Sequence, residues 1–260
     1  DLITNFSGRQ FSNTASYTFN KVDNDAGTVL TGGSGATGNL TIAGPDTLIM
    51  DKSGPTTMSL DVPGTFTLSV QNAGTGTAWD LTVTDLLPNP TPGGMCGTPP
   101  TSVTARLYLP DGITPAAAAL TSGSDFTTSF AGAPSCTLTI TMQSAAAAIP
   151  AGYWLKITYQ ALLDADSVND APVTNVAGAT RWYGADSVPG VTPHTYTRVL
   201  TNGTVGTDDH EDAHSVTPAI PLNGVVYDSV TRQPIAGATV TMLRASTGSA
   251  LPARTIACTP

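Results

Sequence analysis

Residues 66–88, FTLSVQNAGTGTAWDLTVTDLLP, contain two short segments in which apolar and polar residues alternate. Phe66, Leu68 and Val70 share one face of the first segment, and Leu81 and Val83 share one face of the second. A turn rich in Gly, Thr and Asn joins the two segments. A strand pair that buries one face in this way is half of a β-sandwich. The chain is therefore predicted to be all-β, and nothing around this pair resembles a catalytic centre.

The composition supports a chain of many short strands. Its 260 residues suffice for one large or two smaller cores, and 26 Gly and 20 Pro accompany a hydrophobic content of 40%. The net charge of -9 argues against nucleic acid as a partner. The sequence has no run of about 20 apolar residues, so this segment is not expected to span a membrane.

Two of the three cysteines are predicted to form a disulfide bond in an oxidising compartment. Cys96 lies in a Gly- and Pro-rich loop, and Cys136 begins the expected strand CTLTITM. The alternative is two separate buried thiols. Cys258, near the end of the chain, has no obvious partner: it is either free or paired beyond this segment.

A weak internal repeat indicates how the chain divides. Residues 11–19, FSNTASYTF, resemble residues 173–182, VTNVAGATRW, and a Pro-marked strand start follows each copy. We expect tail strands of a preceding β-sandwich module in 1–45, a complete immunoglobulin-like β-sandwich in 46–219, and the beginning of a further β-sandwich module in 220–260. Seven strands are expected in the complete module: Thr47–Met50, Thr65–Gln71, Asp80–Asp85, Ser102–Leu109, Cys136–Gln143, Tyr153–Leu162 and Val173–Arg181.

Ordered motifs carry a resemblance to known families. The runs LIMDKSGP, VPGTFTLSVQNAGTGTAWDLTVTDLLP and TNVAGA, within residues 48–177, resemble the bacterial domain-of-unknown-function-11 repeat. Residues 223–243, NGVVYDSVTRQPIAGATVTML, resemble the opening hairpin of a carboxypeptidase-regulatory-like or collagen-adhesin B-type domain. Such modules recur in tandem in large bacterial surface and secreted proteins. The resemblance therefore implies a stalk, adhesin shaft or filament subunit, located outside the cell or on its surface.

Lys52, Asp85 and Asn175 are candidates for an intramolecular isopeptide bond. The chemistry needs an amine, an acid and an amide buried together, because burial favours the neutral amine and the protonated acid. The order Lys, acid, Asn is similar to that of collagen-adhesin A-type domains, in which the bond ties the first strand to the last. The alternative is a surface Lys52, an Asp85 that caps a turn and an Asn175 bonded to backbone.

Acidic clusters suggest calcium as an optional ligand, with no cofactor required. Residues 210–214, HEDAH, also match the H-E-x-x-H zinc-protease pattern, but their flanks offer no helical apolar stripe, so a solvated linker is favoured over a protease. The candidate metal ligands are Asp164, Asp166, Asn169, Asp170, Asp208, Asp209, Glu211 and Asp212.

The sequence thus favours a structural or adhesive module, not an enzyme. Its expected partners are neighbouring modules or copies of itself, joined by strand exchange through 1–45 or 220–260, with a host or surface ligand as a further partner. The alternative is a carbohydrate- or protein-binding module that uses loops such as 89–100. A sugar-stacking platform of Trp79, Trp154 and Trp182 is a minor variant of that alternative.

Overall fold

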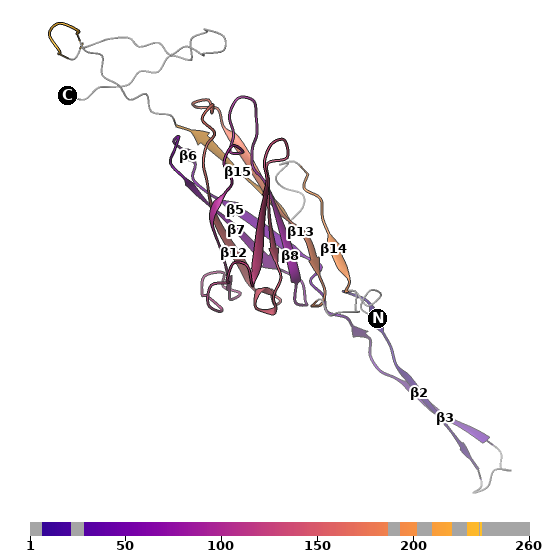
Figure 1. Cartoon of the computed structure of the whole chain (residues 1–260). Helices are drawn as coiled ribbons and strands as arrows, with labels where there is room; N and C mark the ends of the chain where they lie inside the picture. Colours follow the sequence, from indigo (N-terminus) through magenta and orange to yellow (C-terminus); the bar gives the residue numbers. More distant parts are fainter. Residues whose placement is uncertain are drawn as a thin grey trace. The chain divides into compact units, whose positions relative to one another are not determined.

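A computed structural model describes residues 7–21, 29–186, 193–201, 210–219, 228–233 and 235. The chain divides into two compact units, 1–219 and 220–260. In the second unit, the described residues form a turn in which Asp228 Oδ1 accepts hydrogen bonds from the N–H groups of Val230 and Thr231. The first unit contains every described strand (Figure 1).

One sheet of the first unit has four antiparallel strands, in the order β5–β7–β12–β9. These strands are β5 (Leu48–Ser53), β7 (Gly64–Asn72), β12 (Trp154–Ala161) and β9 (Thr101–Tyr108). Burial alternates along β12 from Leu155 to Ala161, as the side-chain period of two requires. The alternation read in the sequence therefore marks a strand with one face in the core.

The second sheet has seven strands and follows the order β10–β11–β8–β13–β15–β6, with β14 paired to β13. Its members are β10 (Phe126–Ala131), β11 (Thr137–Met142), β8 (Trp79–Leu86), β13 (Val173–Tyr183), β15 (Glu211–Pro218), β6 (Thr57–Met58) and β14 (Thr195–Thr197). All its pairings are antiparallel except that of β15 with β6.

The strand order is that of an immunoglobulin-like sandwich. Taken in chain order as A to G, strands β5, β7, β9 and β12 form an A–B–E–D sheet, and β8, β13 and β15 form its C–F–G partner. The hairpin β10–β11 is an addition between the fourth and fifth of these strands, and it extends the second sheet beside β8. The predicted all-β sandwich is confirmed, and each of the seven predicted strands is present.

The two sheets enclose one hydrophobic core. Phe66, Leu68 and Val70 on β7 and Val83 on β8 are completely buried. Trp182 on β13 is also completely buried: its ring stacks on Tyr196 with centroids 5.6 Å apart, and its Nε1 donates a hydrogen bond to the Pro45 carbonyl. Trp182 is therefore a core residue, and its assignment to a sugar-stacking surface is wrong.

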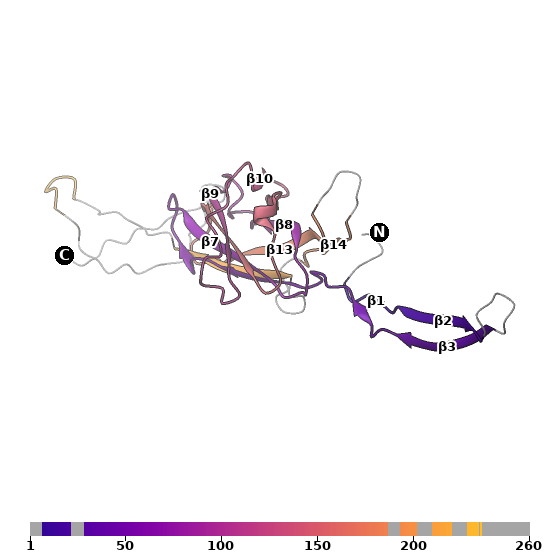
Figure 2. The same ribbon diagram turned by 90° about the horizontal axis from the view of Figure 1, so that it is seen from below.

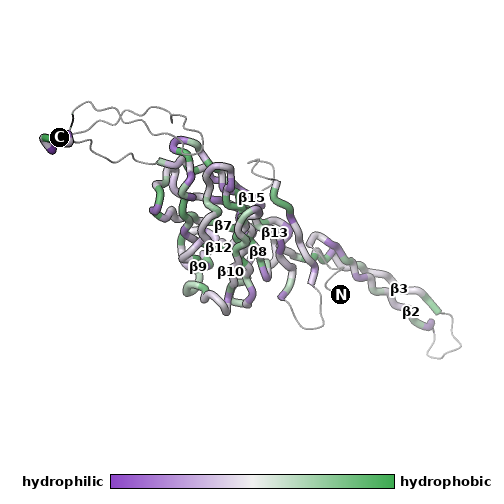
Figure 3. Tube along the Cα trace, turned by 45° about the horizontal axis from the view of Figure 1, so that its top comes forward, coloured by the Kyte–Doolittle hydropathy of each residue, from purple (hydrophilic) through white to green (hydrophobic). Residues whose placement is uncertain are grey.

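Residues before the sandwich form a separate hairpin (Figure 2). Strand β1 (Gln10–Phe11) pairs with β4 (Leu40–Thr41), and β2 (Thr14–Asn20) pairs with β3 (Val29–Ala36). Among the described strands, these four pair only with one another. Every residue of β2 is exposed. Figure 3 shows that hydrophobic residues (green) nevertheless occur in this hairpin as well as in the sandwich.

The structure also contains elements that the sequence did not indicate. Strands β6, β10, β14 and β15 were not expected, and neither was the short 3₁₀ turn η1 (Ala145–Ala147). The solvated linker expected at 210–214 is wrong, because Glu211–Pro218 pairs with β13 from Val173 to Gly178. The sequence of β15 is largely polar, and only its neighbours make it a strand. Among the described residues, no helix has the length and apolar character needed to cross a bilayer.

Candidate crosslinking site

Four side chains from four strands meet between the two sheets. Lys52 on β5 and Tyr159 on β12 come from the four-stranded sheet, while Asp85 on β8 and Asn175 on β13 come from the seven-stranded sheet. Each of them lies at a buried position of its strand. Because alternate residues of a strand face the core, each strand places one polar side chain among apolar neighbours.

The four side chains form one hydrogen-bonded cluster. Lys52 Nζ lies 2.5 Å from Asp85 Oδ2 and 3.1 Å from the Tyr159 hydroxyl. That hydroxyl donates to Asp85 Oδ2 over 2.7 Å and accepts from Asn175 Nδ2 over 2.8 Å. The Tyr159 hydroxyl oxygen therefore contacts both Lys52 Nζ and Asn175 Nδ2. In an amide exchange, these would be the attacking and the leaving nitrogen.

The cluster is closed to solvent and lined by aromatic rings. The side chains of Lys52 and Asp85 have no exposed surface. Phe66 stacks on Tyr159 with ring centroids 5.4 Å apart, and Lys52 Nζ lies 5.6 Å and 5.5 Å from the centres of these two rings. Burial lowers the pKa of the Lys52 amine below its usual 10.5, although the neighbouring Asp85 acts in the opposite direction. A neutral, nucleophilic amine is thus accessible here.

Burial also acts on the tyrosine. It raises the pKa of the Tyr159 hydroxyl well above 10, and the negative charge of Asp85 adds to the increase. The hydroxyl therefore keeps its proton throughout the ordinary range of pH.

Two oxygens of the cluster have no hydrogen-bond partner although they are buried. They are Asp85 Oδ1 and Asn175 Oδ1. A buried polar atom without a partner carries a desolvation cost of roughly 1–3 kcal/mol, so such an atom calls for an explanation. These two oxygens belong to the acid and to the amide carbonyl that an isopeptide reaction would use.

The structure thus brings together the three residues that the sequence singled out. The alternative of a surface Lys52 and a turn-capping Asp85 is wrong, because both are buried in contact with each other. Asn175 does not lie on the last strand: β14 and β15 follow, and β13 is an inner strand between β8 and β15. Sequence reasoning missed Tyr159, and the available signal was a hydroxyl-bearing residue on the inward face of an alternating strand.

The predicted disulfide bond is confirmed. Cys96 and Cys136 are bonded, with their Cα atoms 5.3 Å apart. The bond joins the loop after β8 to the residue just before β11, where the Leu87 N–H also donates to the Cys136 carbonyl over 2.9 Å. Cys258 lies outside the described residues.

The candidate metal ligands have mostly protein partners. Asp164 accepts hydrogen bonds from the N–H groups of Cys96 and Gly97, and Asp212 accepts one from the Lys52 N–H. Glu211 accepts hydrogen bonds from the N–H and hydroxyl groups of Thr201. Asp208 and Asp209 lie outside the described residues. Within the described ranges, no three His, Cys, Asp or Glu side chains are grouped as metal ligands, and calcium binding at Asp166, Asn169 and Asp170 stays a prediction.

The H-E-x-x-H pattern lacks the geometry of a zinc protease. Glu211 and His214 lie in strand β15, whereas that chemistry requires a helix with both imidazoles on one face. One imidazole nitrogen of each histidine is engaged elsewhere, because His210 Nε2 lies 3.2 Å from the Val199 carbonyl oxygen and His214 Nε2 lies 3.1 Å from that of Pro55.

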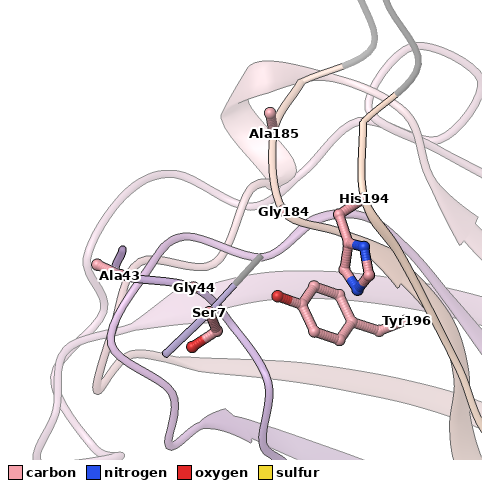
Figure 4. A pocket seen from close by; sticks show the side chains of 7 residues that line it. All are labelled: Ser7, Ala43, Gly44, Gly184, Ala185, His194 and Tyr196. Carbon is pink, nitrogen blue, oxygen red and sulfur yellow. The ribbon is translucent and has the colours of Figure 1, made fainter. Parts of the chain in front are cut away.

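Two pockets lie away from the crosslinking site, and both are small. One, of about 30 Å³, lies beside the rings of His194 and Tyr196, with Ser7 and Gly44 on its other side (Figure 4). The other, of about 110 Å³, is lined by Pro90, Pro92 and the segment around Ser167. Pockets for small-molecule ligands typically span about 300–1,000 Å³. Neither pocket therefore has the size of a usual ligand site.

Comparisons with known proteins gave likeness of structure only. No family model matches the chain, and a search of curated proteins gave no match. The collagen-binding domain of a Staphylococcus aureus adhesin is 10% identical, covering 65% of this chain and 97% of that one, with a TM-score of 0.34. The collagen-binding subdomain of the Enterococcus faecalis surface protein ACE is 10% identical, covering 65% and 96%, with a TM-score of 0.37.

A full-length major pilin, SpaD from Corynebacterium diphtheriae, is also similar. It is 11% identical, and the match covers 65% of this chain and 34% of the pilin, with a TM-score of 0.38. With identities of 10–11% and TM-scores of 0.34–0.38, these likenesses assign no function to the chain.

Proposed function

We propose that this chain is a structural module of a bacterial extracellular or surface protein, and that an isopeptide bond between Lys52 and Asn175 joins its two sheets. The observation that carries the proposal is the buried cluster of Lys52, Asp85 and Asn175, held by hydrogen bonds between β5, β8 and β13. Buried lysines and aspartates are rare unless they are paired, and here the pair lies beside an amide.

The reaction needs no external reagent. One proton moves from the Lys52 ammonium to the Asp85 carboxylate along their 2.5 Å hydrogen bond, which leaves a neutral amine and a carboxylic acid. The amine attacks Cγ of Asn175 and forms the new C–N bond. The acid hydrogen-bonds the amide oxygen, where negative charge develops. The C–Nδ2 bond breaks and the nitrogen leaves as ammonia. The departing nitrogen gains one proton from Nζ, and the Asp85 acid then gives its proton to the released ammonia. The products are therefore an amide crosslink, one ammonium ion and an unchanged aspartate.

Such a bond has a mechanical consequence. Without it, the sheets are held together by the apolar core, which force can separate strand by strand. With it, β5 is covalently tied to β13, an inner strand of the opposite sheet. A pull that detaches β5 would then be transmitted to the middle of the second sheet. A module that carries load in a stalk, shaft or filament benefits from this property.

The disulfide bond supports the proposed location. Disulfides form and persist in oxidising compartments, including the exterior of the cell. The Cys96–Cys136 bond lies in the same sandwich and leaves the crosslinking cluster untouched. A module secreted or displayed at a bacterial surface fits these conditions.

Self-assembly by strand exchange is part of the proposal. In its support, every residue of β2 is exposed, and β2 pairs only with β3 among the described strands. Open strand edges are templates for pairing with another chain. Light scattering across a range of concentrations tests this point: association that is lost when residues 1–45 are deleted supports it, and a monomer at every concentration contradicts it.

Intact mass under denaturing, reducing conditions tests the crosslink directly. We expect the full chain to lack the mass of one ammonia, and peptide mapping to locate a joined peptide that contains Lys52 and Asn175. Lys52→Met should restore the full mass. Lys156→Met, a matched control on β12 of the same sheet, should keep the deficit. A full, unmodified mass for the unaltered chain would remove the crosslink from the proposal.

A further inference from the structure

A single oxygen atom connects every reacting group of the cluster. The Tyr159 hydroxyl accepts from Lys52 Nζ over 3.1 Å and from Asn175 Nδ2 over 2.8 Å, and it donates to Asp85 Oδ2 over 2.7 Å. Its contacts are therefore with the nucleophile, the leaving group and the acid. A crosslinking reaction that uses only Lys52, Asp85 and Asn175 gives this hydroxyl no role.

We propose that Tyr159 is a catalytic residue of crosslinking, whose hydroxyl carries a proton from the attacking Lys52 nitrogen to the departing Asn175 nitrogen. This inference rests on the proposed isopeptide bond. It adds the step that the three-residue scheme leaves open, because ammonia can leave only when its nitrogen has gained a proton.

The position of the hydroxyl is fixed by packing. Tyr159 is completely buried, and its ring stacks on Phe66 at an interplanar angle of 15°. On the strand, Tyr159 is directly opposite Phe66 in the pairing of β12 with β7. The hydroxyl therefore stays between the two nitrogens without the loss of entropy that a mobile side chain would incur.

The change in the amide nitrogen gives the relay its direction. In the starting amide, the lone pair of Nδ2 is delocalised, so this nitrogen donates a hydrogen bond to Tyr159, as observed. After Nζ attacks Cγ, the tetrahedral carbon no longer conjugates with Nδ2, which becomes a basic amine and an acceptor. At the same time, Nζ becomes positively charged and readily gives up a proton.

The proton transfer balances without any other reagent. The Tyr159 oxygen takes one proton from Nζ while its own proton passes to Nδ2, and the hydroxyl is regenerated. The C–Nδ2 bond then breaks, ammonia leaves, and the electron pair on the amide oxygen restores the carbonyl. Burial keeps the pKa of the hydroxyl high, so the two transfers occur together and no free tyrosinate accumulates.

No other group of the cluster can perform this step as directly. Asp85 Oδ2 accepts hydrogen bonds from Lys52 and from Tyr159, whereas neither oxygen of Asp85 is hydrogen-bonded to Asn175 Nδ2. The cluster is buried, so bulk water has no direct access to the departing nitrogen. Tyr159 is the group in contact with both nitrogens.

The rate of crosslinking on refolding tests the relay. Full-length chain is recovered unfolded from inclusion bodies and refolded by dilution, with tryptophan fluorescence reporting folding and intact mass reporting loss of ammonia. Tyr159→Phe keeps the ring and removes the hydroxyl. We expect its crosslinking to be slower by about 10²–10⁴-fold, the usual contribution of a positioned proton donor. Tyr108→Phe, on neighbouring β9, should crosslink at the unaltered rate.

The pH profile separates catalysis from a merely structural role. Without the relay, the departing nitrogen can take a proton only from solvent admitted when the sandwich opens transiently. The rate of Tyr159→Phe should therefore fall as pH rises, unlike that of the unaltered chain. Equal rates in the two chains, or a slower variant with an unchanged pH profile, would overturn the relay while leaving the crosslink in place. Absence of crosslinking in the unaltered chain would overturn both.

A measurement on the unaltered chain avoids any folding defect of the variant. Crosslinking is timed in mixtures of H₂O and D₂O. Two protons in flight at the hydroxyl predict a curved dependence of the rate on the deuterium fraction, because each transfer contributes its own isotope effect. A straight line, or no dependence, would contradict the relay.

Discussion

The sandwich and the hairpin β2–β3 each contain a stacked pair of aromatic rings, in opposite surroundings. The ring centroids of Phe66 and Tyr159 lie 5.4 Å apart in the sandwich, and neither residue has exposed surface. The ring centroids of Tyr17 and Phe19 lie 6.2 Å apart on β2, and these residues are 62% and 49% exposed. Both regions are antiparallel β-structure with apolar residues, as the green segments of Figure 3 show. The difference teaches that alternation makes a strand, while only a facing sheet makes a core.

The largest expected effect comes from removing the crosslink in the sandwich. Asn175→Ala keeps the strand and removes the amide that the proposed bond to Lys52 requires. A bond closing a loop of about 120 residues stabilises the fold by about 5 kcal/mol through the lost entropy of the unfolded chain. We expect the free energy of unfolding in urea to fall by about this amount. Asn169→Ala, outside the site, should change it little. A variant as stable as the unaltered chain would contradict the crosslink.

The next effect comes from the buried charge. Asp85→Leu leaves Lys52 without its partner, whereas Lys52→Met combined with Asp85→Leu replaces the pair by apolar groups. Neither chain can form the crosslink, so the comparison isolates the ion pair. A buried charge left alone costs about 3–5 kcal/mol, and we expect the double variant to be more stable by that amount in urea unfolding. Equal stabilities would show that Lys52 reaches solvent.

The aromatic pairs can be tested directly against each other. Phe66→Ala removes a completely buried ring, and we expect it to cost about 3–5 kcal/mol of unfolding free energy. Phe19→Ala removes a half-exposed ring and should stay within about 0.5 kcal/mol. Thermal and urea unfolding of both variants measure the difference. A large loss for Phe19→Ala would mean that another surface covers the hairpin in solution.

The smallest effect is a dependence of stability on pH in a chain without the crosslink. Burial lowers the pKa of Lys52 in the folded state, so the unfolded chain binds more protons between that lowered pKa and 10.5. The unfolding free energy of Asn175→Ala should therefore rise with pH over the range from that lowered pKa up to 10.5. Adding Lys52→Met should flatten this rise. The same slope in both chains would assign it to other groups.

Much of the fold could be read from the sequence. The seven main strands followed from alternation, and the Cys96–Cys136 bond was predicted from residue type and an oxidising compartment. The choice of Lys52, Asp85 and Asn175 rested on the chemistry of these residues and on the resemblance of their order to collagen-adhesin A-type domains. Strand β15 could not be read, because its polar run from Glu211 to Ser215 shows no alternation and becomes a strand only by pairing with β13.

Tyr159 shows the same limit within the site. In the sequence it is one aromatic residue in an alternating strand, and such residues usually fill the core. Its hydroxyl contacts the groups of the proposed relay only because Asp85 and Asn175 come from the opposite sheet, 74 and 16 residues away in the chain. Sequence spacing carries no information on which polar atoms face each other across a sandwich.

The sequence by itself therefore determined the strands, the disulfide partners and the three residue types needed for an amide exchange, because side-chain period and residue chemistry are local properties. The tertiary structure alone decided that a lysine and an aspartate are buried together, that an asparagine lies on an inner strand and that a tyrosine joins all three. The physical reason is that burial and hydrogen-bond partners arise between sheets, from residues far apart in the chain.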